Sequence, residues 1–145
     1  MFVLPKLIVM KKGLFLFLMV AWATLSYAQE SKYQLSSHIL DITQGTPATG
    51  VTIRLSQMTA DGQWTTVDEK VTDLNGRISD FLKKDPGVDH RGIYKLTYFT
   101  QPYFEQKGEE SFYPFIEVVF ELKDNSHYHV PITLSPFGYS TYRGN

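Results

Sequence analysis

Two histidines lie close together near the C-terminal end of the sequence, within a strong strand pattern. Residues 127–136 read HYHVPITLSP, and four apolar side chains recur at every second position: Tyr128, Val130, Ile132 and Leu134. Because side chains of a strand alternate between its two faces, His127 and His129 share the face opposite to this apolar set. Two imidazoles on one strand face are suited to proton transfer near neutral pH or to metal binding.

His38 and Arg77 are the other candidates for chemistry. His38 lies within residues 35–41, LSSHILD, and Arg77 directly follows an Asn-Gly pair. By themselves, these are more typical of a solvated strand histidine and of a hairpin residue. Together, an imidazole can supply a base or return a proton, and a guanidinium can hold an anion or a developing oxyanion. Alternatively, His38, His127 and His129 supply three imidazoles, the number found in some catalytic zinc sites.

The last residues of the sequence form a further short strand pattern. Residues 137–142 alternate in character, and Ser140 and Tyr142 fall on the same face. With Arg143 they form a segment that we expect to dock against the rest of the domain rather than to fray. Pro131, on the preceding strand, has no N–H to donate, so we expect that strand to be bulged or unpaired there.

Short strands separated by turn residues account for most of the sequence after Glu30. Period-two alternation recurs over 51–56, 93–98 and 115–122, and Asn-Gly, Asp-Gly and Pro-Gly pairs separate such runs. One short helix is expected over 103–107, just after a proline suited to a first helical turn. Seven or eight strands in a chain of this size predict an all-β fold, a two-sheet β-sandwich.

Residues 1–28 differ in composition from the rest of the chain. They contain three lysines and no acid, then an apolar run over 14–23, and small residues three and one positions before residue 29. This is typical of a secretory signal, and the run is shorter than the about 20 residues of a spanning helix. We therefore expect a signal at 1–28 and one domain over 29–145. We expect the domain to be exported, to the periplasm if the source is Gram-negative. After cleavage of the signal we expect no membrane attachment. An uncleaved anchor is the alternative.

The overall composition is that of a globular protein and excludes several functions. Of 145 residues, 43% are hydrophobic and 20% are charged. The absence of cysteine excludes disulfides, thiolate zinc sites and a cysteine nucleophile. The formal net charge of −1 would fall to −4 on loss of the three signal lysines, so no nucleic-acid partner is expected.

Four motifs, in order and in register, give the sequence a strong resemblance to a known family. They are LSSHILD at 35–41 with GTPATGV at 45–51, TDLNGR at 72–77, HYHVP at 127–131 and LSPFGYSTYRG at 134–144. Together they resemble the 5-hydroxyisourate hydrolases, the transthyretin-related proteins of purine catabolism. Transthyretin itself lacks the histidines and the Tyr-Arg-Gly ending.

This resemblance implies a fold, an assembly and a reaction. The fold would be a transthyretin-like sandwich of two four-stranded sheets, and four chains would form a homotetramer, a dimer of dimers with the sites in a central channel. The reaction would hydrolyse 5-hydroxyisourate to 2-oxo-4-hydroxy-4-carboxy-5-ureidoimidazoline without a cofactor or metal. The catalytic residues would be His38, Arg77 and His129, with the roles of base and acid between the two histidines left open. Ser140, Tyr142 and Arg143 would contact the substrate.

Two other functions fit the same fold, and two features depart from the family. A transthyretin-like carrier of small ligands would gain nothing from two histidines beside an arginine. A structural sandwich module, as found in exported multidomain proteins, is less expected because this sequence contains one domain and ends on the C-terminal motif. The family usually ends in serine, where this chain has Asn145; we expect a mild effect. Export is also unusual among bacterial relatives. His90 lies in a charged loop that the resemblance does not explain, and we interpret it as solvated.

Overall fold

The computed structural model describes residues 31–144, so the predicted signal at 1–28 lies outside the described part. Within that part the chain forms nine strands and one short helix, and no helix there is long and apolar enough to span a membrane. The elements are β1 (Tyr33–Asp41), β2 (Thr46–Pro47), β3 (Thr52–Met58), β4 (Trp64–Val71), β5 (Arg77–Lys83), β6 (Gly92–Phe99), α2 (Gln101–Glu105), β7 (Ile116–Leu122), β8 (Tyr128–Ser135) and β9 (Gly138–Thr141).

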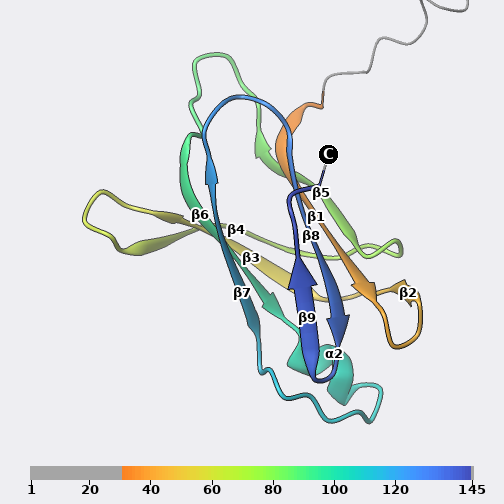
Figure 1. Ribbon diagram of the computed structural model, residues 1–145. Helices are drawn as coiled ribbons and strands as arrows, with labels where there is room; N and C mark the ends of the chain where they lie inside the picture. The colour runs from red at the N-terminus through yellow and green to blue at the C-terminus, as the bar shows by residue number, and fades with distance from the viewer. Residues whose placement is uncertain (1–30, 145) are drawn as a thin grey trace, which may run out of the picture. The chain divides into compact units, whose positions relative to one another are not determined.

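The strands form two sheets, which confirms the predicted all-β sandwich. One sheet has the order β2-β1-β8-β9, with β5 also paired to β1, and the other has the order β4-β3-β6-β7. Figure 1 shows β1, β8 and β9 side by side, with β5 on the other side of β1. The first sheet has one strand more than expected, because Thr46 and Pro47 pair with the end of β1 as the two-residue strand β2.

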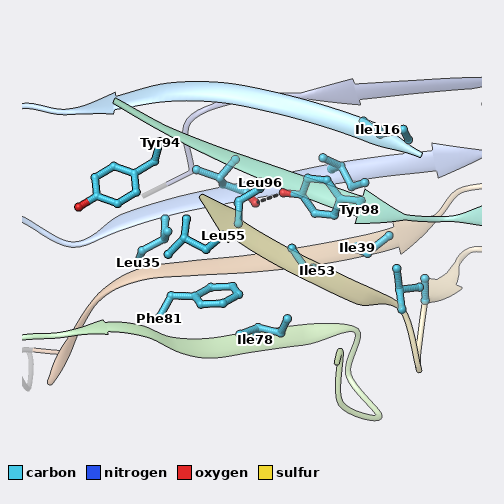
Figure 2. Close-up of a cluster of buried hydrophobic side chains, with 14 of the residues drawn as sticks. Leu35, Ile39, Ile53, Leu55, Ile78, Phe81, Tyr94, Leu96, Tyr98 and Ile116 are labelled. Carbon is cyan, nitrogen blue, oxygen red and sulfur yellow. Dashed lines mark hydrogen bonds between the residues drawn. The ribbon is translucent and has the colours of Figure 1, made fainter. Parts of the chain in front are cut away.

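The core lies between the sheets and includes the alternating apolar residues predicted within 51–56, 93–98 and 128–134. Figure 2 shows aliphatic and aromatic side chains from β1, β3, β5 and β6 meeting there. Along β8 the four apolar residues at alternate positions are all at most 6% exposed, as predicted. Burial of this set fixes which face of β8 turns outward, because a slip of one residue would expose all of it.

β1 and β8 are parallel neighbours although they are about ninety residues apart in the sequence. Ser36 is opposite His129 and His38 is opposite Pro131 in this pairing. On the other side of β8, pairing with β9 stops at Ile132 and resumes at an isolated bridge between His129 and Gly144. The ladder is therefore interrupted beside Pro131, as expected for a residue with no N–H.

A buried carboxylate at the end of β1 contacts the short helix and pairs with a lysine just after it. The Asp41 carboxylate accepts hydrogen bonds from the Tyr103 hydroxyl (2.8 Å) and the Lys107 ammonium (3.0 Å). Burial alone would raise the pKa of Asp41, but these two donors and the Gln44 backbone outweigh it and lower that pKa.

The helix begins two residues earlier than predicted, at Gln101, because Pro102 occupies its first turn rather than preceding it.

Candidate active site

His38 and His129 emerge on the same face of two neighbouring strands. In β1, Leu35, Ser37 and Ile39 are fully buried in the core, so the residues between them turn to the opposite face. In β8, His129 alternates with the buried Tyr128 and Val130 in the same way. We call this face of the first sheet, opposite to the core, its outer face. Both rings are half-buried there.

Arg77 is brought to His38 by the hairpin that precedes β5. Arg77 is directly opposite His38 in the antiparallel pairing of β1 with β5. The Asp73 carboxylate accepts hydrogen bonds from the backbone N–H of Asn75 (2.8 Å) and of Arg77 (2.9 Å), which fixes the turn. Arg77 is exposed and opposite His38, so it can present its positive charge to a ligand on the outer face.

Gly76 allows this hairpin to lie against β1. Its φ is +68°, and its carbonyl accepts a hydrogen bond from the N–H of Ile39 at 2.9 Å. A Cβ at this position would lie 2.6 Å from the Ile39 carbonyl oxygen. Only glycine satisfies both the backbone conformation and the close approach without a shift of the chain.

The environment of His38 favours the neutral imidazole. Burial and, second, the positive charge of Arg77 lower its pKa below the ordinary value of 6.5. A hydrogen bond to the Asn75 backbone and the charge of Asp73 act in the opposite direction but do not reverse the shift. His38 is therefore available as a base at neutral pH.

The pKa of His129 is also lowered, by a larger set of neighbours. Burial comes first, followed by the charges of Arg77, His38 and His127, and together they lower the pKa of His129 below 6.5. A hydrogen bond to the Ser36 backbone opposes them. The structure thus brings together all three residues that the resemblance designated as catalytic, within electrostatic reach of each other.

Ser36 is a site residue that the sequence analysis did not identify. Its hydroxyl oxygen lies 2.8 Å from Nδ1 of His129 and 2.9 Å from Nε2 of His127. His127 Nδ1 in turn lies 2.9 Å from the Tyr33 carbonyl oxygen. The only sequence signal was that Ser36 falls on the same face as His38, and the pairing that places it beside His129 joins strands far apart in sequence.

The three-imidazole zinc hypothesis requires ring nitrogens that converge. Both nitrogens of His127 are already engaged, by Tyr33 and by Ser36. Across residues 31–144, no three histidine, aspartate or glutamate side chains are grouped closely enough to hold a metal ion. The donor geometry of these residues therefore does not favour His127 as a zinc ligand.

The segment after β9 reaches His129. The Gly144 N–H donates to the His129 carbonyl at 2.9 Å. A Cβ on Gly144 would lie 2.5 Å from Cδ2 of the His129 ring, so the segment can approach this closely only with glycine. The predicted docking of the C-terminal segment therefore occurs, and it occurs against a candidate catalytic ring.

The three predicted substrate contacts are divided between two places. Ser140 is on the outer face, where its hydroxyl is 2.7 Å from that of Thr133. Arg143 lies with its guanidinium carbon 4.6 Å from the ring centroid of Tyr128, a residue of the core-facing set. Arg143 and Tyr142 line a groove of about 380 Å³ between β7 and β8. In this chain, therefore, Arg143 does not lie with the histidines.

His90, which the motifs left unexplained, contacts the last residue of β5. Its Nε2 lies 2.8 Å from the Lys83 carbonyl oxygen, and this contact involves none of the site residues above.

Comparisons with known proteins give one consistent family. The family model described as the HIUase/Transthyretin family matches residues 35–144. The 5-hydroxyisourate hydrolase of Mus musculus is 42% identical over 113 residues, which cover 77% of this chain and 94% of the mouse protein.

Solved structures of a hydrolase and of a transthyretin both match this chain. The structure of Klebsiella pneumoniae 5-hydroxyisourate hydrolase matches with a TM-score of 0.65 and 40% identity, over 77% of this chain and 98% of the other. The crystal structure of transthyretin from Sparus aurata matches with a TM-score of 0.69 and 35% identity, over 77% and 96%. The fold is thus as similar to a transthyretin as to a hydrolase, and the side chains of the outer face must distinguish the two.

Proposed function

The chain belongs to the HIUase/Transthyretin family, and from this premise we propose that it hydrolyses 5-hydroxyisourate with His38, Arg77 and His129 as its catalytic residues. One observation carries the proposal. Two imidazoles with lowered pKa values and one guanidinium share the outer face of the first sheet. A carrier of uncharged aromatic ligands would have no use for this set.

These residue types match the demands of the reaction. Water adds to a ring carbonyl carbon and gives up a proton to a neutral imidazole. The oxygen of that carbonyl becomes negatively charged, and Arg77 is placed to stabilise it. The ring C–N bond then breaks, the nitrogen takes a proton from an imidazolium, and the product is a carboxylate. Each positioned acid or base contributes roughly 10²–10⁴-fold to the rate.

The substrate contacts of Ser140, Tyr142 and Arg143 remain part of the proposal. Ser140 has the better support, because it is on the outer face with the histidines. A contact from Arg143 requires the residues after Thr141 to turn away from Tyr128 when substrate binds.

We also propose that four chains assemble as a dimer of dimers. The support is family membership and the exposed apolar side chains of the two edge strands, Val119 of β7 (56% exposed) and Tyr139 of β9 (41% exposed). Assembly would enclose the outer faces and limit access of water to the site.

Export is proposed on the composition of residues 1–28 alone. Expression of the full chain in a Gram-negative host should yield a periplasmic protein whose first residue is Gln29. A cytoplasmic protein that retains Met1 would contradict export without affecting the proposed reaction.

The function is tested by an absorbance time course. Urate oxidase generates fresh 5-hydroxyisourate, and the purified chain is added after treatment with a chelator. The proposal predicts faster loss of the hydroxyisourate absorbance than in buffer alone. Acceleration that disappears with chelator and returns with zinc would contradict the metal-free mechanism, and no acceleration in either condition would favour the carrier.

A further inference from the structure

A continuous series of hydrogen bonds on the outer face ends at the ring of His129. It begins at the Tyr33 carbonyl oxygen, 2.9 Å from His127 Nδ1. It continues from His127 Nε2 to the Ser36 hydroxyl at 2.9 Å, and from that hydroxyl to His129 Nδ1 at 2.8 Å. Ser36 is only 9% exposed, so its hydroxyl is largely shielded from water that could replace either contact.

The chemistry of the first acceptor fixes the direction of every later bond. A carbonyl oxygen can only accept, so His127 Nδ1 carries a hydrogen. When His127 is neutral, its Nε2 has no hydrogen and must accept from the Ser36 hydroxyl. Ser36 has a single hydrogen to donate. Its oxygen must therefore accept from His129, whose Nδ1 carries the hydrogen.

From this series we infer that Ser36 and His127 are positioning residues that hold neutral His129 in its Nδ1–H tautomer, leaving the Nε2 lone pair to accept the proton of the attacking water. The inference deepens the proposed function and rests on it. It also resolves a point that the sequence left open, since it gives His129 an unprotonated Nε2 at the start of the reaction. Ser36 and His127 do not themselves need to touch the substrate.

Two features of the surroundings agree with this role. In many sites a carboxylate accepts from the second ring nitrogen of a histidine, orients the ring and raises its basicity. Here a neutral hydroxyl takes the place of the carboxylate and orients the ring. The pKa of His129 stays below its ordinary value. The charged or titratable groups that act on the ring are Arg77 from β5, His38 from β1 and His127 just before β8. All of them favour a neutral ring, the form in which the tautomer matters.

The test is a direct measurement of ring tautomers in the whole protein. Nitrogen-15 NMR of histidine-labelled protein, recorded well above the ordinary histidine pKa of about 6.5, distinguishes Nδ1–H from Nε2–H rings. The chain contains four histidines, and His90→Ala identifies the loop signal. We expect His127 and His129 both as Nδ1–H, the reverse of the tautomer that free neutral histidine prefers. An Nε2–H signal for His129 would overturn the inference.

A variant outside the reacting groups tests the direction of the series. In His127→Phe the Ser36 hydroxyl loses its acceptor and becomes free to donate to His129 Nδ1. His129 should therefore change to Nε2–H, and kcat should fall about 10-fold or more with little change in KM. Ser36→Ala should release the tautomer preference, Ser36→Thr should retain it, and His90→Ala should change neither tautomer nor kcat.

The two proposals fail separately. If the protein does not hydrolyse hydroxyisourate, the proposed function fails, yet the NMR of the wild-type protein still decides the tautomer. If hydrolysis is normal and His129 stays Nδ1–H in His127→Phe, the positioning role of His127 is wrong.

Discussion

At the residue scale, the charge of Arg77 acts on the two histidines beside it, in addition to the role in catalysis that we propose for it. Its charge is the second cause, after burial, of the lowered pKa of both His38 and His129. A lower pKa means that each histidine is neutral in a larger fraction of the molecules at a given acidic pH. Activity that needs a neutral imidazole should therefore persist below the ordinary histidine pKa of about 6.5.

Replacing Arg77 by glutamine tests this coupling. Loss of the positive charge should raise both histidine pKa values, so the acidic limb of the kcat/KM profile should move to higher pH. The maximum of kcat/KM should also fall about 10²–10³-fold, because the oxyanion loses its partner. Arg77→Lys retains the charge and should leave the limb near its wild-type position. A limb that does not move in Arg77→Gln would contradict the electrostatic account.

The lowered pKa values of His38 and His129 also determine how folding stability changes with pH. Folded-state pKa values below the unfolded value of about 6.5 mean that the unfolded chain binds more protons in that interval. The contribution of these two histidines to stability is therefore present above that pH and is lost as pH falls through their folded pKa values.

Some residues of the site could be predicted from the sequence and others could not. His129 could be placed on the outward face because four buried residues alternate with it along β8. Ser36 could not be connected to it, because that contact depends on which strands are neighbours, and no local pattern encodes the parallel pairing of β1 with β8. The position of Arg143 beside Tyr128 could not be predicted for a related reason, since regular strand pairing ends at Thr141.

At the scale of elements, the hairpin before β5 determines where Arg77 lies. Its Asn-Gly pair was visible in the sequence as a turn, but the close approach of Gly76 to the backbone of Ile39 was not. The helix was also visible, although its bounds differed from those predicted, because helix termini are less strongly encoded than helix existence.

Gly76→Ala should destabilise the fold more than an ordinary change at a turn glycine. Left-handed backbone costs alanine about 1–2 kcal/mol, and displacement of the Ile39 carbonyl adds about 1–3 kcal/mol. Gly45→Ala is the matched control, since Gly45 has nearly the same φ (+69°) but nothing within 4 Å of an added Cβ. Urea unfolding of both variants measures the difference. Equal losses would show that the contact with β1 does not matter.

The C-terminal segment provides a second element-scale prediction. Gly144→Ala places a Cβ 2.5 Å from the His129 ring and should displace the ring or the segment, with kcat lowered about 10-fold or more. Unfolding temperature should change little, because the change is beyond the last strand. Gly138→Ala, whose added Cβ would meet only Ser135 Oγ at 3.6 Å, should keep its activity. Equal activity of the two variants would contradict the role of this contact.

At the scale of the whole molecule, the fold and the function are separate questions. The two-sheet architecture was predictable because alternating burial recurs in strand after strand, and the two-residue β2 was missed because two residues carry no period. The same architecture matches a transthyretin and a hydrolase about equally well. The outer-face side chains, rather than the sandwich, therefore distinguish the two functions.

The proposed assembly can be measured directly. Light scattering of the purified domain should give four times the mass of one chain, because the exposed apolar residues on the edge strands need partners. Val119→Glu, on the exposed face of β7, should lower that mass without unfolding the subunit. A monomer at micromolar concentration with full activity would contradict the tetramer and leave the catalytic residues unaffected.

We propose that His38 and His129 perform the hydrolysis together. The most direct test compares kcat/KM on freshly generated 5-hydroxyisourate for the wild type, His38→Ala, His129→Ala and the double variant, with circular dichroism to show that each is folded. We expect a loss of roughly 10²–10⁴-fold in kcat/KM for each single variant and, in the double variant, a loss smaller than the product of the two. Wild-type turnover in both folded single variants would contradict it.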